Sequence, residues 1–179
     1  SLYSQIHKSF LNKDYAAVDR LSNDFLQGRR TQEHREDALL LQALALFKLN
    51  RAIEARAKFL ELEGSFVSVD DKAGASLSIA ESYSDLGDDG QAYQNYKTTF
   101  KKYPDASQTP YVLYQLLKLS EKMKRHEESI FYKASLLRDH AASREAQNAQ
   151  MRFTSVPEID RLGSALRQIS LEEQHLFSV

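Results

Sequence analysis

A short glycine-containing segment is the first place where this sequence could do chemistry. Asp85, Asp88 and Asp89 surround Gly87 in the stretch DLGDDG. Such carboxylates could hold a metal ion, and such a loop could hold a phosphate. A calcium loop, however, needs oxygen ligands at alternating positions and a distal glutamate, and a phosphate loop needs a glycine-rich run before a lysine. The segment has neither pattern, and we interpret it as a turn between two helices.

Catalytic side chains elsewhere form no recognised pattern. The sequence has no cysteine, which excludes thiol nucleophiles, disulfides and thiolate zinc sites. Its five histidines have no ligand partner at a recognised helical spacing, and no Gly-x-Ser-x-Gly motif for a nucleophilic serine is present. We therefore predict a protein that is not an enzyme, with no metal site and no cofactor. The alternative left open is a pocket lined by convergent acidic or histidine side chains.

Composition favours a helical protein without a dominant charge. The 179 residues include only 6 Gly and 3 Pro, and good helix formers such as Ala, Leu, Glu and Lys dominate. The 24 basic and 25 acidic residues leave a net charge of −1, so no bulk field attracts nucleic acid or anionic lipid. No apolar run approaches the roughly 18 residues that cross a bilayer. We expect no nucleic-acid partner and no membrane span in this fragment.

One pattern of a helix end, a turn and a following small residue occurs four times along the chain. Helix ends followed by turns are predicted at Leu11-Asn12, Leu49-Asn50, Leu86-Gly87 and Met123-Lys124. The interval from position 12 to 50 is 38 residues, and those from 50 to 87 and from 87 to 124 are 37 residues. Small residues follow each turn at Ala17, Ala55, Ala92 and Ser129, and one helical turn later come Leu21, Phe59, Tyr96 and Lys133. Ala43, Ala80 and Leu117 precede three of the turns, again 37 residues apart.

Each repeat therefore predicts a helix, a short turn and a second helix. Small side chains let two antiparallel helices approach to about 8–10 Å. The expected pairs are Glu36–Leu49 with Ile53–Glu63, Lys72–Leu86 with Gly90–Tyr103, and Thr109–Met123 with Glu127–His140. Gly87 permits a positive φ where the first helix ends, and Asp88 or Asp89 can cap the next helix.

The C-terminal part predicts further helices that cap the array. Residues 141–153 have apolar residues at helical spacing, and a second stripe follows at Ile159, Leu162, Leu166 and Ile169. A terminal helix must cover the open face of the last repeat. Leu176 and Phe177 in the final segment either complete this cap or contact a partner.

These residues resemble the tetratricopeptide repeat family. The third repeat matches the family pattern best, through Ala80, Tyr83, Gly87, Ala92, Tyr96 and Pro104. The second repeat keeps Ala43, Ala55 and Phe59 but has Asn50 in place of the glycine. The resemblance implies an all-α, right-handed α-solenoid of about four hairpins plus C-terminal capping helices. It would form one domain over 1–179, with repeats at 1–35, 36–71, 72–108 and 109–140, and an extra helix and cap at 141–179.

The resemblance also implies a surface for a partner. In this family the first helix of each pair lines a concave groove that binds a peptide or partner domain. Transferred to this sequence, the contact positions are Leu44, Phe47, Lys48, Glu81, Asp85, Tyr111, Tyr114, Lys118 and Lys122. The basic and Asn residues of the family's carboxylate clamp are not present as a set. Phe47, Tyr111 and Tyr114 could equally pack between neighbouring helices.

The long repeats and the YPDAS link at 103–107 are similar to those of periplasmic tetratricopeptide proteins of Gram-negative bacteria. This similarity implies a non-catalytic protein-interaction scaffold, in a periplasmic or outer-membrane-associated setting if it holds and otherwise in the cytoplasm. The alternative is a structural module that forms a homo-oligomer through exposed solenoid ends.

Overall fold

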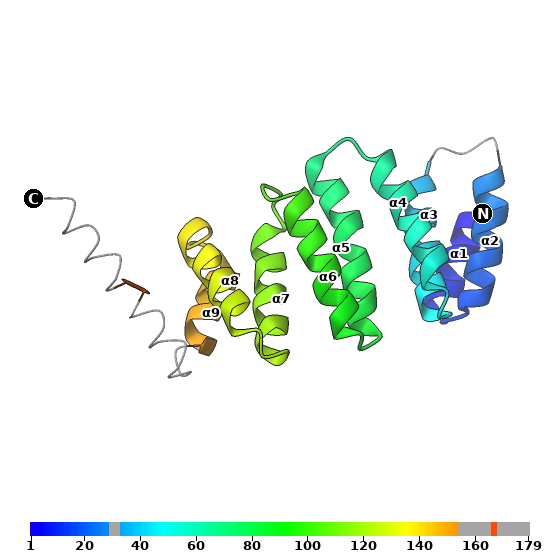
Figure 1. Ribbon diagram of the computed structural model, residues 1–179. Coiled ribbons are helices and arrows are strands. Elements are labelled where there is room, and N and C mark those ends of the chain that lie inside the picture. The colour runs from blue at the N-terminus through cyan, green and yellow to red at the C-terminus, as the bar shows by residue number, and fades with distance from the viewer. Residues whose placement is uncertain (29–32, 154–165, 168–179) are drawn as a thin grey trace, which may run out of the picture. The chain divides into compact units, whose positions relative to one another are not determined.

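The chain is all-helical, as predicted. The computed structural model describes residues 1–28, 33–153 and 166–167, and these form nine α-helices and no β-strand (Figure 1). The helices are α1 (Leu2–Leu11), α2 (Tyr15–Gln27), α3 (Arg35–Lys48), α4 (Ala52–Ser65), α5 (Val69–Asp85), α6 (Asp89–Lys102), α7 (Thr109–Lys122), α8 (His126–Asp139) and α9 (Arg144–Phe153). Every helix pair expected in the second, third and fourth repeats is present, with ends that differ from the expected ones by three residues or fewer.

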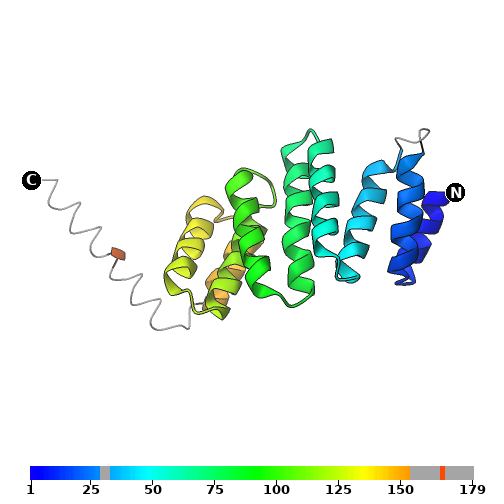
Figure 2. The same ribbon diagram turned by 45° about the vertical axis from the view of Figure 1, so that its right-hand side comes forward.

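The helices divide into two compact units, which are described separately. The first unit covers residues 1–108 and holds α1 to α6, and the second begins at Thr109 and holds α7 to α9. In the first unit each helix packs against the next one, and α1 also contacts α3 (Figures 1 and 2). In the second unit α7 packs against α8, and α9 contacts both of them. Sequential packing of this kind is typical of a helical repeat arrangement.

One backbone turn ends the first helix of all four pairs. Its central residue has a left-handed conformation, with φ of 59° at Lys13, 61° at Asn50, 77° at Gly87 and 58° at Lys124. The next residue donates its N–H to the carbonyl oxygen five positions back, in the pairs Asp14–Ser9 (2.9 Å), Arg51–Leu46 (2.9 Å), Asp88–Tyr83 (3.0 Å) and Arg125–Ser120 (2.7 Å). This is the Schellman arrangement, which satisfies carbonyl groups at a helix end.

The first repeat corrects the predicted register by one residue. The left-handed residue is Lys13, so all three intervals between turns are 37 residues and the first interval of 38 was wrong. Consequently Val18 takes the buried place that we expected for Ala17, which is only half-buried. Ser22 likewise takes the place of Leu21. A lysine in a position that favours glycine concealed this shift.

Apart from Ala17, the small residues predicted at the helix crossings lie in the core. Ala43, Ala80 and Leu117 are fully buried on α3, α5 and α7, and Ile6 extends the series to α1 at the same interval. On the second helices of the pairs the buried series is Val18, Ala55, Ala92 and Ser129. Short side chains at the crossing points allow the close approach of paired helices.

Polar contacts tie the two ends of the α5–α6 hairpin together. The Asp70 carboxylate at the start of α5 accepts the Ser107 N–H at 2.8 Å, and Gln108 Nε2 donates to the Asp70 carbonyl oxygen at 2.8 Å. The bond from the Ser107 backbone lowers the pKa of Asp70 below its usual range. These bonds attach the segment after α6 to α5.

Part of the predicted cap lies outside the described residues. This applies to Ile159, Leu162, Ile169 and the tail residues Leu176 and Phe177. The predicted helix at 141–153 is present as α9, which begins three residues later than expected. Among the described helices, none combines the length and apolar character that a membrane span requires.

Candidate functional site

A small hollow lies where α3 and α5 meet. Leu44, Phe47 and Lys48 line it from α3, Ser82 and Asp85 line it from the last turn of α5, and Leu86 lines it from the position directly after α5. Its volume is about 20 Å³, a size that suits one water molecule. The hollow brings together four of the nine residues that the family resemblance selected, namely Leu44, Phe47, Lys48 and Asp85.

Phe47 forms the floor of this hollow, and its side chain is buried rather than exposed to a partner. Its side chain is 2% exposed. Its ring lies 5.0 Å from the Tyr83 ring in an edge-to-face arrangement and 5.9 Å from the Phe59 ring. Aromatic pairs with this geometry stabilise a core beyond their buried area. Of the two alternatives left open for Phe47, packing between helices is the one observed, and half-buried Leu44 lies beside it.

Two opposite charges stand at the rim of the hollow. Lys48 and Asp85 are both exposed, and within the described residues neither of them has an ion-pair partner. Glu81, one helical turn before Asp85, is half-buried. Leu86 completes the rim with 45% of its surface exposed. Apolar surface between a free cation and a free anion can contact a chain segment of mixed character.

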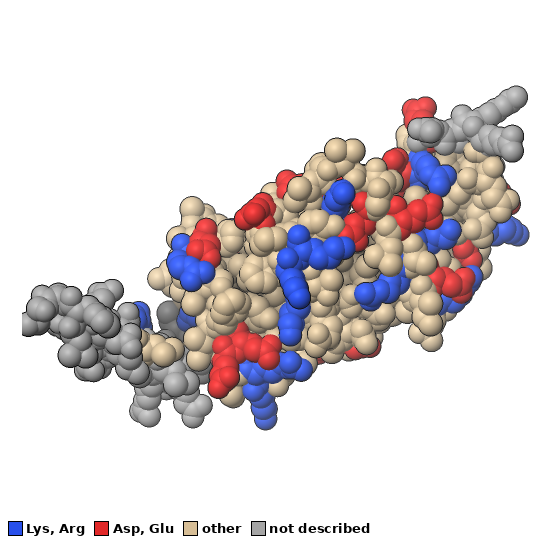
Figure 3. Space-filling view, turned by 45° about the horizontal axis from the view of Figure 1, so that its top comes forward, with Lys and Arg blue, Asp and Glu red and all other residues tan. Residues whose placement is uncertain are grey.

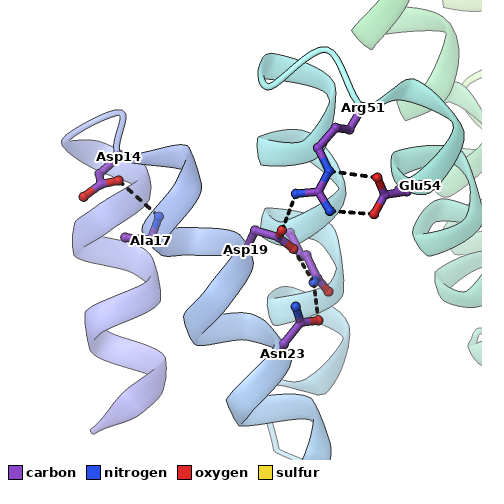
Figure 4. A network of polar contacts seen from close by, with 7 residues as sticks. Asp14, Ala17, Asp19, Asn23, Arg51 and Glu54 are labelled. Atoms are coloured by element: carbon purple, nitrogen blue, oxygen red, sulfur yellow. Dashed lines mark hydrogen bonds and ion pairs between the residues drawn. The ribbon is translucent and has the colours of Figure 1, made fainter.

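A polar network connects α3 and the turn after it to the neighbouring helices (Figure 4). Arg51, directly after the turn, contacts the Asp19 carboxylate on α2 at 2.5 Å and Glu54 on α4 at 2.6 Å. Buried Gln42 on α3 donates to Asp19 at 2.9 Å and to Asn23 at 2.8 Å. The hydrogen bond from Arg51 lowers the pKa of Glu54. Three helices are thereby connected through one guanidinium group and one amide.

The remaining predicted residues lie on α7 in the second unit. Tyr111 and Tyr114 are half-buried, and the ammonium group of Lys118 lies 4.8 Å from the centre of the Tyr114 ring. A cation over an aromatic face at this distance is attracted by about 0.5–1 kcal/mol at an exposed site. Lys122 is exposed one turn further along. Tyr114 and Lys118 thus form a small platform that is both aromatic and cationic.

The constant interval gives positions on α1 that correspond to predicted contact positions on α3 and that the sequence analysis did not name. Counting back 37 residues from Leu44 and Lys48 gives His7 and Leu11, one and two helical turns after Tyr3. Leu11 is 68% exposed, and the Tyr3 ring stacks on His34 with centroids 4.2 Å apart. A search for an apolar residue 37 positions before Ala43 would have found Ile6 and with it this helix.

A second, more open hollow of about 230 Å³ lies at the start of α8. Arg125, His126, Glu127 and Glu128 line it, and Arg125 contacts Glu128 at 3.4 Å. On the same helix, burial raises the pKa of Tyr132 to about 12, with a contribution from Glu128. Within ranges 1–28, 33–153 and 166–167, no three His, Asp or Glu side chains are grouped closely enough to hold a metal ion.

Charge is distributed without a dominant sign. On the face drawn in Figure 3, Lys and Arg side chains are interspersed with Asp and Glu side chains. This agrees with the net charge of −1 and favours local pairing over long-range attraction of a polyanion.

In comparisons with known proteins, no protein-family model matches this chain, and no curated protein matches it.

Proposed function

We propose that this chain is a non-catalytic scaffold of the tetratricopeptide type that binds a peptide or a partner domain. In the first unit the binding surface would be formed by the first helices of the pairs, α1, α3 and α5, and in the second unit, taken by itself, it would be formed by α7. The turn that recurs four times at a constant spacing and the buried small residues support the comparison with that family. A periplasmic, envelope-associated setting stays a prediction of the resemblance.

The hollow between α3 and α5 is the observation that carries the proposal. Its floor is apolar and held rigidly by the ring contacts of Phe47, and Lys48 and Asp85 stand on its rim without ion-pair partners in the described part of the chain. A surface of this kind is largely formed before binding, so the scaffold loses little conformational freedom when a partner arrives.

The lining residues favour a particular kind of partner segment. Because the hollow is smaller than a side chain, an apolar residue of the partner would lie over Leu44 and Leu86 instead of entering deeply. A basic group beside that residue would approach Asp85, and an acidic group on its other side would approach Lys48. The Tyr114–Lys118 platform would accept a carboxylate or a ring, since aromatic and cationic groups often provide most of the binding energy.

Peptide selection with matched variants tests this proposal. A displayed library of random peptides, about 12 residues long to span neighbouring helices, is selected on the wild-type chain. The affinities of the selected peptides are then measured by fluorescence anisotropy. We expect Lys48→Ala or Asp85→Ala to weaken peptides bound at the first unit by about tenfold, and Tyr114→Ala or Lys118→Ala to do so for peptides bound at α7. Circular dichroism should be unchanged in all four variants.

Variants on the second helices of the pairs provide the control. Asp24→Ala on α2 and Lys101→Ala on α6 remove exposed charges of the same kinds, and the affinity should stay within about twofold of the wild type. Equal weakening by the control variants, or unchanged binding in all four test variants, would contradict the proposed surface.

A further inference from the structure

The outer face of α4 carries an apolar stripe that the fold does not use. Ile53, Ala57, Leu60 and Gly64 recur at spacings of four, three and four residues, which places them on one side of the helix. Ile53 is 88% exposed and Leu60 is 50% exposed, and Ala57 and Gly64 are also exposed. The opposite side of α4 carries Ala55, Phe59 and Leu62, which are buried in the core. The helix is therefore apolar on two opposite faces.

The other second helices of the first unit show that the repeat does not require this stripe. At the positions 37 residues later, α6 has Gly90, Gln94, Lys97 and Lys101. At the positions 37 residues earlier, α2 has Ala16, Arg20, Asn23 and Gln27. The outward positions of α2 and α6 thus hold polar or small residues, and only α4 among the three exposes an isoleucine and a leucine. Exposed apolar residues that the fold does not need mark a contact surface.

Charged residues of opposite sign border the stripe. A helical turn of 100° per residue puts Glu54 and Glu61 along one edge and Arg56 along the other. Arg56 donates to the neutral Asn95 side chain at 3.1 Å and has no ion-pair partner among the described residues. Glu61 contacts Arg35 at 2.9 Å and Lys58 at 3.9 Å, and its side chain is 45% exposed. Both edges are accessible to a partner helix.

We propose that α4 pairs side by side with α4 of a second copy of this chain, in a parallel two-fold arrangement. In a parallel pair each acidic edge meets the basic edge of the other copy, so Arg56 of one copy approaches Glu61 of the other, twice over. In an antiparallel pair like edges would meet, which would set Arg56 against Arg56 and Glu54 against Glu61. The charge pattern therefore makes the stripe complementary to the same stripe on a second copy, and it favours the parallel orientation over the antiparallel one.

The contact is small, and the association depends on concentration. The four stripe residues extend over three helical turns, and a single pair of short helices buries less than the roughly 1,200 Å² of a stable complex. Dimerisation should become visible between about 10 µM and about 1 mM protein. Because this face differs from the proposed peptide surface on α3 and α5, variants that abolish dimerisation should still bind the selected peptides.

Sedimentation equilibrium across that concentration range tests the pairing. The mass of the wild type should rise from 20.5 kDa towards twice that value. A triple variant combines Ala57→Gln, Leu60→Lys and Gly64→Lys, which gives α4 the residue types that α6 has at the equivalent positions. This variant should remain monomeric. Leu11→Lys, which changes an exposed leucine on α1, should dimerise as the wild type does. A wild type that stays monomeric throughout, or a triple variant that dimerises normally, overturns the proposal, and so does loss of dimerisation in Leu11→Lys.

A charge exchange separates the parallel pair from other contacts. Arg56→Glu and Glu61→Arg should each raise the dissociation constant at least tenfold, since each sets like charges against one another across the pair. The double variant restores opposite charges and should return to within about threefold of the wild type. Circular dichroism at each step checks that the helices are intact. Failure of the double variant to recover overturns the parallel arrangement.

Discussion

At the scale of the residue, the left-handed position after each first helix is the most informative feature. Gly87 occupies it in the third repeat, whereas Lys13, Asn50 and Lys124 adopt the same conformation with a side chain. A Cβ atom added at Gly87 would meet no atom within 4 Å. The cost of a side chain there is therefore the intrinsic strain of the left-handed backbone, about 1 kcal/mol.

This strain predicts opposite effects of two exchanges in equivalent turns. Lys124→Gly should increase the free energy of unfolding by about 0.5–1 kcal/mol, and Gly87→Lys should decrease it by about 1 kcal/mol. Urea denaturation followed by circular dichroism measures both changes. The control is Gln115→Gly, nine residues earlier in the interior of α7, which should destabilise by about 1 kcal/mol because glycine is unfavourable within a helix. A destabilised Lys124→Gly variant would contradict the assigned turn.

At the scale of the element, one buried carboxylate connects the second helices of adjacent hairpins. Glu63, near the end of α4, is 7% exposed and accepts hydrogen bonds from Lys102 and Tyr103 at the end of α6. The hydrogen bond to Glu63 raises the pKa of Lys102. Burial, together with the bond to Glu63, raises the pKa of Tyr103. Both groups therefore hold their protons more tightly in the folded chain.

The direction of these shifts predicts an alkaline loss of stability. A raised pKa stabilises the fold fully below the ordinary values, about 10 for Tyr and 10.4 for Lys, and this contribution disappears as the pH rises through the folded values. Glu63→Gln should lower the free energy of unfolding by about 1–2 kcal/mol near neutral pH, and by less at about pH 11. Urea denaturation at both pH values measures the difference.

The exposed neighbour Glu61 provides the control for this prediction. Glu61→Gln on the same helix removes a carboxylate whose ion pairs are accessible to solvent, and such pairs contribute about 0–1 kcal/mol. The loss in free energy of unfolding caused by Glu61→Gln should not become smaller at alkaline pH in the way expected for Glu63→Gln. A constant difference between the wild type and Glu63→Gln at all pH values would refute the role of Lys102 and Tyr103.

At the scale of the whole molecule, stability is expected to be local. In the first unit each helix packs mainly against its neighbours in the chain, and α1 contacts α2 and α3. In such arrays the stability is close to a sum of repeat and nearest-neighbour contributions. A change in the core of one hairpin should therefore affect that hairpin and the next one, and leave more distant helices intact.

Amide hydrogen exchange on Ile6→Ala tests this locality. Ile6 is fully buried among Val18, Ala38 and Ala45, and truncation of a buried isoleucine costs about 2–5 kcal/mol. Protection should decrease in α1, α2 and α3 and stay unchanged in α5 and α6. Ser4→Ala, an exposed change on the same helix, should leave all protection unchanged. A uniform loss of protection over the first unit in Ile6→Ala would show that its helices unfold together.

Much of the architecture could be predicted from the sequence because its causes are local. Pro104 and Gly87 mark helix ends through backbone constraints that act within a few residues, and small residues recur at each helix crossing. The positions of Ala55 and Ala92 in the core were therefore correct. The first repeat was misread by one residue, because Lys13 occupies the turn without the usual preference for that conformation.

The tertiary structure alone decided which of the selected side chains share a surface. Phe47 and Lys48 are adjacent in the chain, yet one is buried against Tyr83 and the other is exposed beside Asp85. The apolar stripe of α4 likewise became visible only when its opposite face was seen to fill the core. The sequence alone determined the helices and their spacing through short-range backbone preferences, whereas burial depends on contacts between residues far apart in the chain, which folding alone brings together.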